Sequence, residues 1–443
     1  MIKNGLSMTS SPESADEDWG RLYISRKCIG AANCRNFAPD LLGEVAPDHD
    51  LVNNGGAHVA GPLVLQGSHD KGAFTGVVRQ PRSKEEYLTA RTAAAACPLA
   101  AIRLEKAAED IPAAELGDPW REWPRRLEDN VWALGNSARR NIGALTYFIE
   151  LPGGGILVDL PTPSEKLFRW LEAHGGVRWM FLTHRDHVQH HAEFAVRFPE
   201  SRRVMGAADV NMRPRSWGDV TDAVEVKLGN ALIPMTLDGT PIPQEALADS
   251  ELAVLPQPGH TPGSLCLLYN GRFLFTGDHL HYSHRLGHIV APRLQCWDDW
   301  DRQCDSVSQL AAWAEAGRLH FQWLLPGHGE WHRFDADGTS SVTANELNNT
   351  LEWMRRQPSG HVPMRNWVPF VMSRMNPRSR LGRFVLAVGG EGGEAWVLPR
   401  ASRQYLIDYN PATTDAAIRR LYAVAAVGLA TVSLLIWLAV RML

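Results

Sequence analysis

Short apolar runs separated by polar turns dominate the middle of the chain. The runs VWALG, ALTYFIEL and GILVDL follow one another closely, and the segment SEKLFRWLEAHGG then precedes WMFLTH. Apolar runs of this length predict strands, and the longer mixed segment predicts a helix. A strand-rich start followed by strand–helix alternation predicts a layered α/β arrangement from residue 131 onward.

The longest apolar run lies near the C-terminus. Residues 421–440 read LYAVAAVGLATVSLLIWLAV, without a charge. Twenty residues at about 1.5 Å each are enough to cross the roughly 30 Å hydrocarbon core of a bilayer. We therefore expect residues 419–443 to form a single C-terminal transmembrane helix. Arg419 and Arg420 precede the run, which favours a cytoplasmic main body.

The remaining segments have weaker patterns. Residues 1–20 are polar and are expected to be a disordered lead, with no apolar core for a signal peptide. Residues 109–130 hold prolines and mixed charges without periodicity, so a linker is expected there. In the extension 336–418, NELNNTLEWMRRQ predicts a surface helix and RFVLAVGGEGGEAWVLP predicts two strands around a glycine turn.

Composition narrows the function classes. The 443 residues are 44% apolar and 21% charged, as in a globular protein of two or three domains. A net charge of −4 gives no sign of a nucleic-acid surface. Six cysteines are too few for a disulfide framework and point to metal or redox chemistry. Twelve of the 17 histidines lie between His184 and His332.

Three cysteines near the N-terminus are spaced for cluster chemistry. Cys28 and Cys34 flank the loop IGAAN, and Cys97 precedes a proline in AAAACPLAAI. Thiolates hold iron–sulfur clusters, and a glycine-containing loop can wrap around one. Gly30 and the small alanines beside it let the backbone approach the cluster.

Residues 21–108 resemble the single-cluster bacterial ferredoxins. The family's middle cysteine is replaced by Ala31, which leaves Cys28, Cys34 and Cys97 as ligands. This resemblance implies a ferredoxin-like domain with a three-iron (3Fe-4S) cluster, whereas a four-iron (4Fe-4S) cluster would need a ligand other than cysteine. It also implies a redox partner protein. The stretch 46–80 is expected to be an inserted loop.

Four polar sites each follow a strand-like run. They are FLTHRDHVQHH, LPQPGHTPGS, FLFTGDHL and WLLPGHGEW. Imidazole nitrogen and carboxylate oxygen are the ligands of catalytic zinc and of non-haem iron. Loops at strand ends can bring distant ligands together, and Asp278 could bridge two metal ions.

The order of these sites over residues 131–335 resembles that of the metallo-β-lactamase superfamily, with GHTPGS and TGD as the most specific pieces. The resemblance implies an αββα sandwich with a two-metal site at one edge, holding zinc or iron. Carried over by position, His260, Asp278 and His328 match the later ligands, and His184 matches the first histidine. The fold class is thus multidomain α+β and α/β.

The first motif departs from the family after His184. Read without a gap, Asp186 stands at the second histidine, and Val188 and Gln189 replace the aspartate and last histidine. Either a nearby histidine substitutes or one metal position is degraded. The favoured ligands are His184, Asp186 and His191, and the further candidates are His187 and His190.

Other residues nearby are given lesser roles. His187 and His191 are four residues apart and would share a face on a helix. His279, His281, His284 and His288 are expected to be supporting or loop residues. Cys266, Cys296 and Cys304 lack a ligand pattern and are expected to be buried thiols.

Three functions remain open. The first is a metal-dependent hydrolase of a small-molecule substrate, with Asp186 and Asp278 as catalytic residues. The second is a di-iron oxidoreductase fed with electrons by the ferredoxin domain. An acidic residue at position 186 also occurs in the flavodiiron branch of the superfamily, which hints at iron. The third is a redox sensor or binding protein with a degenerate metal site.

Overall fold

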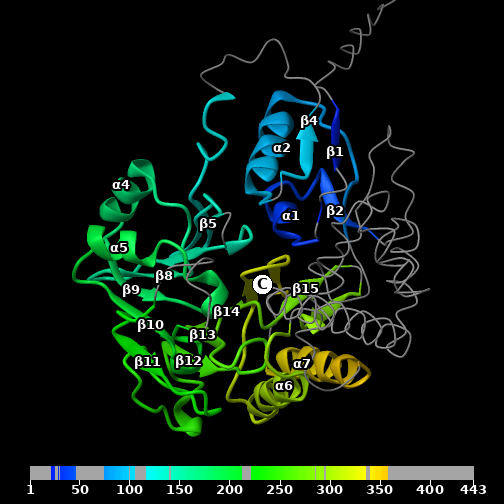
Figure 1. The fold of residues 1–443 in the computed structure, drawn as a ribbon. Helices are drawn as coiled ribbons and strands as arrows, with labels where there is room; N and C mark the ends of the chain where they lie inside the picture. The colour runs from blue at the N-terminus through cyan, green and yellow to red at the C-terminus, as the bar shows by residue number, and fades with distance from the viewer. Residues whose placement is uncertain are drawn as a thin grey trace, which may run out of the picture.

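The computed structural model describes residues 21–357 except for several internal segments. These segments are 25–27, 29, 46–73, 99, 105–115, 139–140, 212–220, 285, 294–295 and 336–339. Figure 1 shows a small N-terminal part in blue beside a larger two-sheet part in green and yellow. The expected lead 1–20 and the two strands expected after residue 380 lie outside the described residues.

The N-terminal part, which we call the cysteine module, comprises residues 21–104. Its elements are β1 (Leu22–Ile24), α1 (Asn33–Phe37), β2 (Leu42–Val45), β3 (Phe74–Val77), α2 (Lys84–Ala96) and β4 (Ile102–Leu104). β1 pairs antiparallel with β4, and β2 with β3. Because β1 leads towards Cys28 and β4 follows Cys97, the first pairing brings distant cysteines to one end of the module.

Helix α2 has clear local causes. Its N-cap Ser83 accepts a hydrogen bond from the backbone amide of Glu86 at 3.2 Å, which satisfies one of the free first-turn amides. Alanines then fill the last turns, where they favour the helix and let α2 pack closely on α1. The helix ends at Ala96, one residue before Cys97 and the following Pro98, which cannot continue a helix.

The larger part is built on two sheets. The first has the order β11-β10-β9-β8-β7-β6-β5, with strands β5 (Arg125–Glu128), β6 (Val131–Ala133), β7 (Tyr147–Ile149), β8 (Gly155–Val158), β9 (Val177–Phe181), β10 (Arg202–Gly206) and β11 (Val226–Leu228). The second has the order β12-β13-β14-β17-β18, with β12 (Leu252–Pro256), β13 (Leu265–Tyr269), β14 (Phe273–Gly277), β17 (Trp323–Pro326) and β18 (His332–Arg333). A hairpin of β15 (His281–Ser283) and β16 (His288–Val290) stands beside them.

The sheets pack face to face with helices outside. Along β13, Leu265 and Leu267 point into the core between the sheets, whereas Cys266 and Leu268 point outward, as the two-residue period of a strand requires. Helices α4 (Glu165–Ala173) and α5 (His191–Arg197) cover the outer face of the first sheet. Helices α6 (Trp300–Glu315) and α7 (Ser340–Arg355) cover the second. The predicted layered α/β arrangement is confirmed, and its layers run α, β, β, α.

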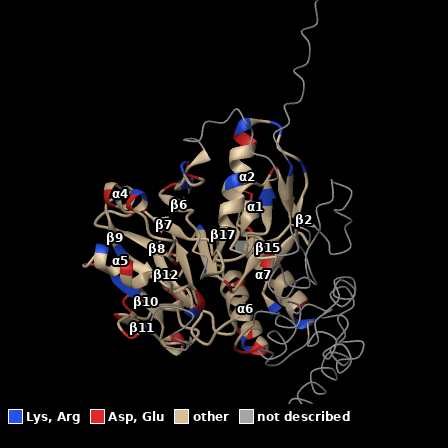
Figure 2. Ribbon diagram, turned by 45° about the horizontal axis from the view of Figure 1, so that its top comes forward, with Lys and Arg blue, Asp and Glu red and all other residues tan. Residues whose placement is uncertain are grey.

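Charge follows the same layering. Figure 2 shows Lys, Arg, Asp and Glu on α2, α4 and α5 and at the ends of α6. The strands between the helical layers are mostly tan in that view. The outer helices therefore present charge to solvent and bury their apolar faces.

The sandwich extends past both of its expected bounds. β5 begins at Arg125, inside the expected linker, because it pairs antiparallel with β6. α7 lies in the expected C-terminal extension, but Leu347, Leu351 and Met354 are buried against α6. This helix is therefore part of the sandwich and does not lie on the surface alone.

Over the stretch that the structure covers, no helix combines the length and apolarity that a membrane crossing needs. The expected anchor at residues 419–443 lies outside the described residues, so it stays a prediction.

Candidate metal centre

The predicted ligand loops meet at one edge of the sandwich. β14 and β17 run parallel, so Asp278 and His328, which follow them, leave the second sheet on the same side. β12 runs in the same direction, since β13 is antiparallel to both of its neighbours, and His260 follows it. His184 follows β9 of the first sheet. Strand direction alone therefore brings four loops together.

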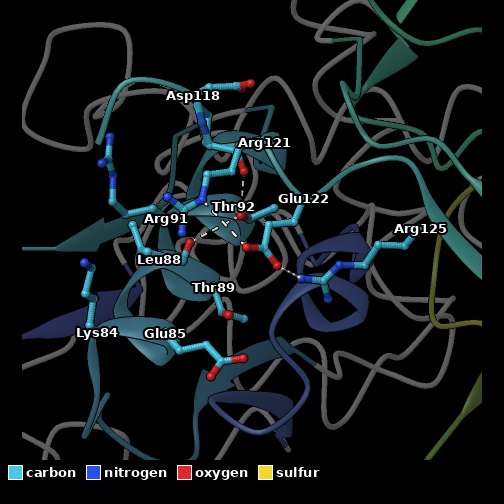
Figure 3. A pocket seen from close by; sticks show the side chains of 11 residues that line it. Lys84, Glu85, Leu88, Thr89, Arg91, Thr92, Asp118, Arg121, Glu122 and Arg125 are labelled. Carbon is cyan, nitrogen blue, oxygen red and sulfur yellow. Dashed lines mark hydrogen bonds and ion pairs between the residues drawn. The ribbon is translucent and has the colours of Figure 1, made fainter. Parts of the chain in front are cut away.

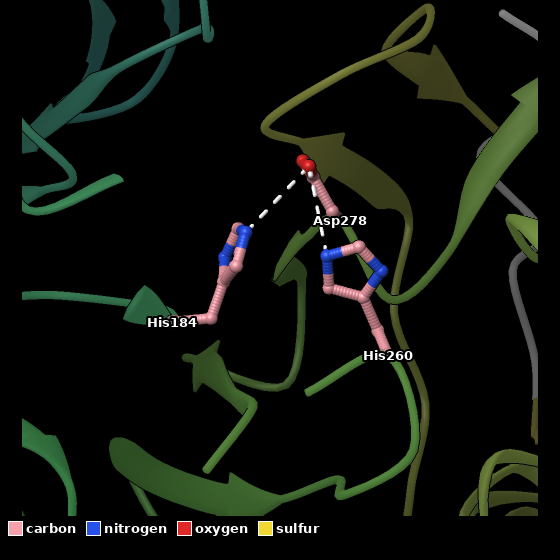
Figure 4. Close-up of side chains that lie close together, drawn as sticks. All are labelled: His184, His260 and Asp278. Carbon is pink, nitrogen blue, oxygen red and sulfur yellow. Dashed lines mark ion pairs between the residues drawn. The ribbon is translucent and has the colours of Figure 1, made fainter. Parts of the chain in front are cut away.

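Two groups of side chains could each hold a metal ion, and they share Asp278. The first consists of His184, His260 and Asp278 (Figure 4). The Nε2 atoms of His184 and His260 lie 3.6 and 3.8 Å from Oδ2 of Asp278. Ligand atoms that bind one tetrahedral metal ion at about 2 Å lie about 3.3 Å apart. The first group is therefore close to the spacing of a ligand set.

The second group consists of His187, Asp278 and His328. Oδ1 of Asp278 lies 3.6 Å from Nε2 of His187 and 2.8 Å from Nδ1 of His328. Oδ2 of Asp278 thus faces His184 and His260 and Oδ1 faces His187, whereas Nδ1 of His328 lies within 2.9 Å of both oxygens. Such a carboxylate can bridge two metal ions.

Hydrogen bonds orient the imidazoles. Asp159 accepts from Nδ1 of His187 at 2.7 Å and from the Thr183 hydroxyl at 2.8 Å. Since that hydroxyl donates to Asp159, it accepts from Nδ1 of His184 at 3.0 Å. Nε2 of both histidines is then the ring nitrogen that faces Asp278. In His328 the two nitrogens exchange these roles. Nε2 donates to the carbonyl of Ile142 at 3.2 Å, and Nδ1 is the nitrogen that faces Asp278.

The fit to metal ions rests on unpaired buried atoms. Within the described part of the chain, Nε2 of His184, Nε2 of His187 and both ring nitrogens of His260 have no hydrogen-bond partner. All three side chains are about 1% exposed. Buried polar atoms without partners are costly, and metal ions would satisfy these nitrogens. The residues present therefore fit a centre of two divalent ions.

The electrostatics around Asp278 agree with this fit. Burial alone would raise the pKa of Asp278, but His328, His187 and His184 hold it well below its usual range. Burial lowers the pKa of His260 to about 4. Burial also opposes a charge on His187, yet Asp278 and Asp159 raise its pKa to about 9. The carboxylate is therefore ionised and ready to bind cations.

The other residues of the first motif lie differently. Asp186 is 26% exposed beside the first group, with Oδ2 3.8 Å from Nε2 of His184. His190 forms an ion pair with Glu193 at 2.9 Å. Nδ1 of His191 lies 3.1 Å from the guanidinium of Arg203, away from Asp278.

This placement revises the preference for His191. His187 ends a short 3-10 turn (Arg185–His187), and α5 begins only at His191. His190 between them has φ 70°, in the left-handed region. His187 and His191 therefore do not share a helix, and the structure brings His187 to the second group in place of His191.

Two carboxylates that the sequence patterns did not single out support the ligand loops. Asp159 follows β8 directly and orients His187 as described. Asp209 is buried and accepts hydrogen bonds from the amide of Arg185, the hydroxyl of Thr261 and the amide of Gly263. It thereby joins the loop of His184 to the loop of His260. An aspartate placed directly after a buried strand run was the available signal for Asp159.

The histidines after Asp278 are outside both groups. His279 is buried, and burial lowers its pKa to about 3. His281 lies in β15, and His284 is within 3.7 Å of Glu330. His288 contacts a backbone carbonyl at 2.6 Å. His281 and His288 therefore lie in strands β15 and β16 and not in loops, and a supporting role for the four histidines stays a prediction.

The three N-terminal cysteines converge in the cysteine module. Burial raises the pKa of the Cys28 and Cys34 thiols to about 11 and about 12, and in both cases Cys97 adds to the rise. The amide of Gly30 donates to Cys28 at 3.5 Å and that of Ala101 to Cys97 at 3.2 Å. Three thiols, two of them with amide donors, therefore gather in this module.

The loop of Cys34 contacts the loop of His328. The side chain of Asn33 accepts from the amide of Gly329 at 3.0 Å and donates to the carbonyl of Gly143 at 2.5 Å. The side chain of Asn36 donates to the carbonyl of Gly329 at 2.9 Å. The two candidate cofactor sites are therefore joined by direct hydrogen bonds.

A separate pocket of about 380 Å³ lies between α2 and residues 118–125 (Figure 3). Its walls carry both signs of charge, from Lys84, Arg91, Arg121, Arg125, Glu85, Asp118 and Glu122. No residue of the two metal groups and none of the three cysteines lines it.

Comparison with known proteins finds a hydrolase that is similar to part of this chain. Over 141 residues the chain is 36% identical to the hydroxyacylglutathione hydrolase of Anaeromyxobacter dehalogenans (strain 2CP-C). The match covers 31% of this chain and 46% of that relative, so the chain spans about half the length of the relative. This relative supports the metallo-β-lactamase resemblance. It is also consistent with a metallo-hydrolase.

The solved structures that resemble this chain do so at low sequence identity. The DIM-1 metallo-β-lactamase shares 16% identity at a TM-score of 0.35, covering 51% of this chain and 96% of that one. The metallo-β-lactamase of Pontibacter korlensis shares 17% at 0.36, covering 53% and 98%. No model of a known protein family matches the chain.

Proposed function

We propose that this chain is a metal-dependent hydrolase whose cysteine module carries an iron–sulfur cluster. The observation that carries the hydrolase proposal is the pair of histidine groups that share Asp278. Divalent ions held there, zinc or iron, would supply Lewis-acid polarisation of a carbonyl and an activated water at neutral pH.

The side chains then have distinct roles. Asp278 would contribute to both groups, because Oδ2 faces His184 and Oδ1 faces His187. Asp186 is partly exposed beside His184, where its carboxylate can accept a hydrogen bond from the attacking water and orient it. Asp159 and Asp209 touch no substrate and position the ligands.

The substrate class to test first is a thioester. The relative from Anaeromyxobacter is named a hydroxyacylglutathione hydrolase, and its match spans 141 residues of this chain. Esters and β-lactams are the alternatives, because each also presents a polarised carbonyl to an attacking water.

The test is metal analysis of anaerobically purified full-length protein together with hydrolysis of these substrates. We expect two divalent ions at the sandwich and metal-dependent turnover. The variant Asp278→Asn should lose both, whereas Asp305→Asn, an exposed carboxylate on α6, should keep both. A wild-type protein with a single ion in the sandwich would contradict the two-metal hydrolase.

The cluster proposal rests on the cysteine module. Cys97 lies close enough to Cys28 and Cys34 to add to the rise in their thiol pKa, and Cys28 and Cys97 accept hydrogen bonds from amides. Three thiolates match a three-iron cluster, and a four-iron cluster would take a further ligand. A redox partner protein would exchange electrons with it.

A second function, a di-iron oxidoreductase, is favoured by one observation. The loop that carries Cys34 is hydrogen-bonded to the loop that carries His328. A hydrolase has no need of an electron carrier at that position. Iron in place of zinc at the sandwich, with a substrate-dependent change in the cluster spectrum, would support this function over hydrolysis.

We also propose that residues 419–443 anchor the protein in a membrane with its main body in the cytoplasm. The support is the uncharged run from Leu421 to Val440 and the arginine pair before it.

A further inference from the structure

We propose that Asn33 is a positioning residue that makes metal binding at the second group depend on the cysteine module. The second group is His187, Asp278 and His328. This inference rests on the proposed function, since it needs both a metal centre and a loaded cysteine module.

The position of Asn33 is the first observation. It is 2% exposed and directly precedes Cys34, yet its side chain reaches into the sandwich. Oδ1 accepts from the amide of Gly329 at 3.0 Å, and Nδ2 faces the carbonyl of Gly327 at 3.4 Å. These two glycines flank His328. One side chain therefore contacts the backbone on both sides of a metal ligand.

Asn33 also holds the partner of the His328 ring. Nδ2 donates to the carbonyl of Gly143 at 2.5 Å. The preceding residue, Ile142, offers the carbonyl that contacts Nε2 of His328 at 3.2 Å. Asn33 thus fixes both the backbone of His328 and the acceptor that orients its imidazole.

The ligand loop is held from two sides. Within the sandwich, the amide of Gly327 donates to the carbonyl of Gly277 and its carbonyl accepts from the amide of Leu145, both at 2.7 Å. A side chain at Gly327 would place its Cβ 2.5 Å from Cε1 of His187, so the loop must stay bare where it passes the metal site. Gly329 has φ 105°, which only glycine adopts readily. At Gly329 the contacts come instead from the cysteine module, through the carbonyl of Ala31 and the side chains of Asn33 and Asn36.

Helix α1 transmits the position of Cys34. It has five residues, which is far too short for stability as an isolated helix. Its contacts with the sandwich include Arg35 with Glu330 at 2.8 Å and Asn36 with the carbonyl of Gly329 at 2.9 Å. Cysteine ligands bound to a cluster would tie this short helix down on its other side.

Thermodynamic linkage gives the consequence. If an occupied cysteine loop favours the position of α1 that holds His328, it favours metal binding at the second group, and the reverse also holds. The hydrogen bonds of Asn33 reach neither His184 nor His260, so the first group is linked to it only through the shared Asp278. Loss of the cluster should therefore weaken the second metal position more than the first.

The experiment is zinc titration of full-length protein against a chelating chromophore, with iron and sulfide measured on the same samples. The variants are Asn33→Ala, Cys34→Ser and the double replacement. Asn33→Asp keeps the acceptor for Gly329 and serves as the conservative variant. Gln80→Ala is the matched control, because Gln80 pairs with the backbone of Leu22 inside the module, far from the ligand loop.

In the wild type we expect two zinc ions. Asn33→Ala should weaken the second by about 10- to 100-fold, as removal of groups that orient a ligand does, with unchanged iron content. Asn33→Asp should weaken it less. Cys34→Ser should lose iron and weaken the same zinc ion, and the double replacement should add no further loss. Gln80→Ala should keep both affinities.

If Asn33→Ala, or an iron-free Cys34→Ser, bound zinc as tightly as the wild type, the coupling would be overturned. Two bound zinc ions in those samples would still support the metal centre. Failure of the proposed function has a different signature, which is a wild type that binds fewer than two metal ions. Equal weakening in Gln80→Ala would mean that the module acts only through its general stability, and that too would overturn the role of Asn33.

Discussion

At the scale of single residues, the metal centre consists of the imidazoles whose ring nitrogens face Asp278. Three histidines aim unpaired nitrogens at Asp278, whereas His191 contacts Arg203 and His190 contacts Glu193. Histidine content alone could not separate these roles, because all five imidazoles are chemically equal. Their surroundings make the difference.

The first prediction separates His187 from His191. His187→Ala should lower the metal content from two ions towards one, since it removes an unpaired ligand of the second group. His191→Ala should keep two ions, because its ring lies against Arg203. Metal analysis of both purified variants, with melting curves to check folding, is the measurement. Two ions in both variants would mean that the second site uses neither residue.

At the scale of elements, the helices outside the sheets close the sandwich. α6 begins at the N-cap Asp299, which accepts from the amide of Arg302 at 2.9 Å, and α7 packs along it. The indole of Trp300 also donates to the carbonyl of Met354 at 3.2 Å. The end of α7 is thus joined to the start of α6, and α7 belongs to the hydrophobic core.

The second prediction follows from this packing. Leu347→Ala should lower the free energy of unfolding by about 2–5 kcal/mol, because a fully buried leucine leaves a cavity. Val342→Ala, on the same helix but 37% exposed, should cost well under half as much. Denaturant unfolding followed by the near-ultraviolet tryptophan signal is the measurement. Equal losses of unfolding free energy in the two variants would mean that α7 is not packed into the hydrophobic core.

At the scale of the whole molecule, the cysteine module and the sandwich share one core. Phe37 packs edge-on against Trp120 and Trp123 at 5.3 and 4.9 Å, and the apolar cluster continues from there between the sheets. Arg35, only 2% exposed, lies between Glu44 of the module and Glu330 of the sandwich. Buried charges at such an interface favour a fixed contact, since separation would leave them unpaired.

The third prediction tests the cysteine module in the intact chain. Cys97→Ser should remove the brown colour and lower iron and sulfide together, because one of three thiolates is lost. Cys304→Ser, a partly buried thiol on α6, should keep both. Iron and sulfide assays with visible absorption are the measurement. Unchanged iron after replacement of all three module cysteines would refute the cluster.

The fourth prediction concerns residues 419–443. Their deletion should move the protein from the membrane fraction to the soluble fraction, because about 20 apolar residues supply the insertion free energy. Fractionation with high-salt and carbonate washes is the measurement. Membrane association that survives both washes in the deleted protein would contradict the anchor.

Sequence by itself indicated which segments form strands and which residues are candidate metal ligands. Short apolar runs such as GILVDL predicted buried strands, because apolar side chains on both faces must be covered. The pattern also marked His260, Asp278 and His328, because each follows a strand-like run. Strand direction then places all three at one edge.

Only the tertiary structure decided which residues meet. His187 and His191 look equivalent at a spacing of four, but the left-handed turn at His190 sends them to different neighbours. Asn33 and Gly329 lie 296 positions apart, and their hydrogen bond exists only because the cysteine module docks on the sandwich. Local patterns record what each segment can form, whereas contacts between distant segments depend on how the completed surfaces fit together.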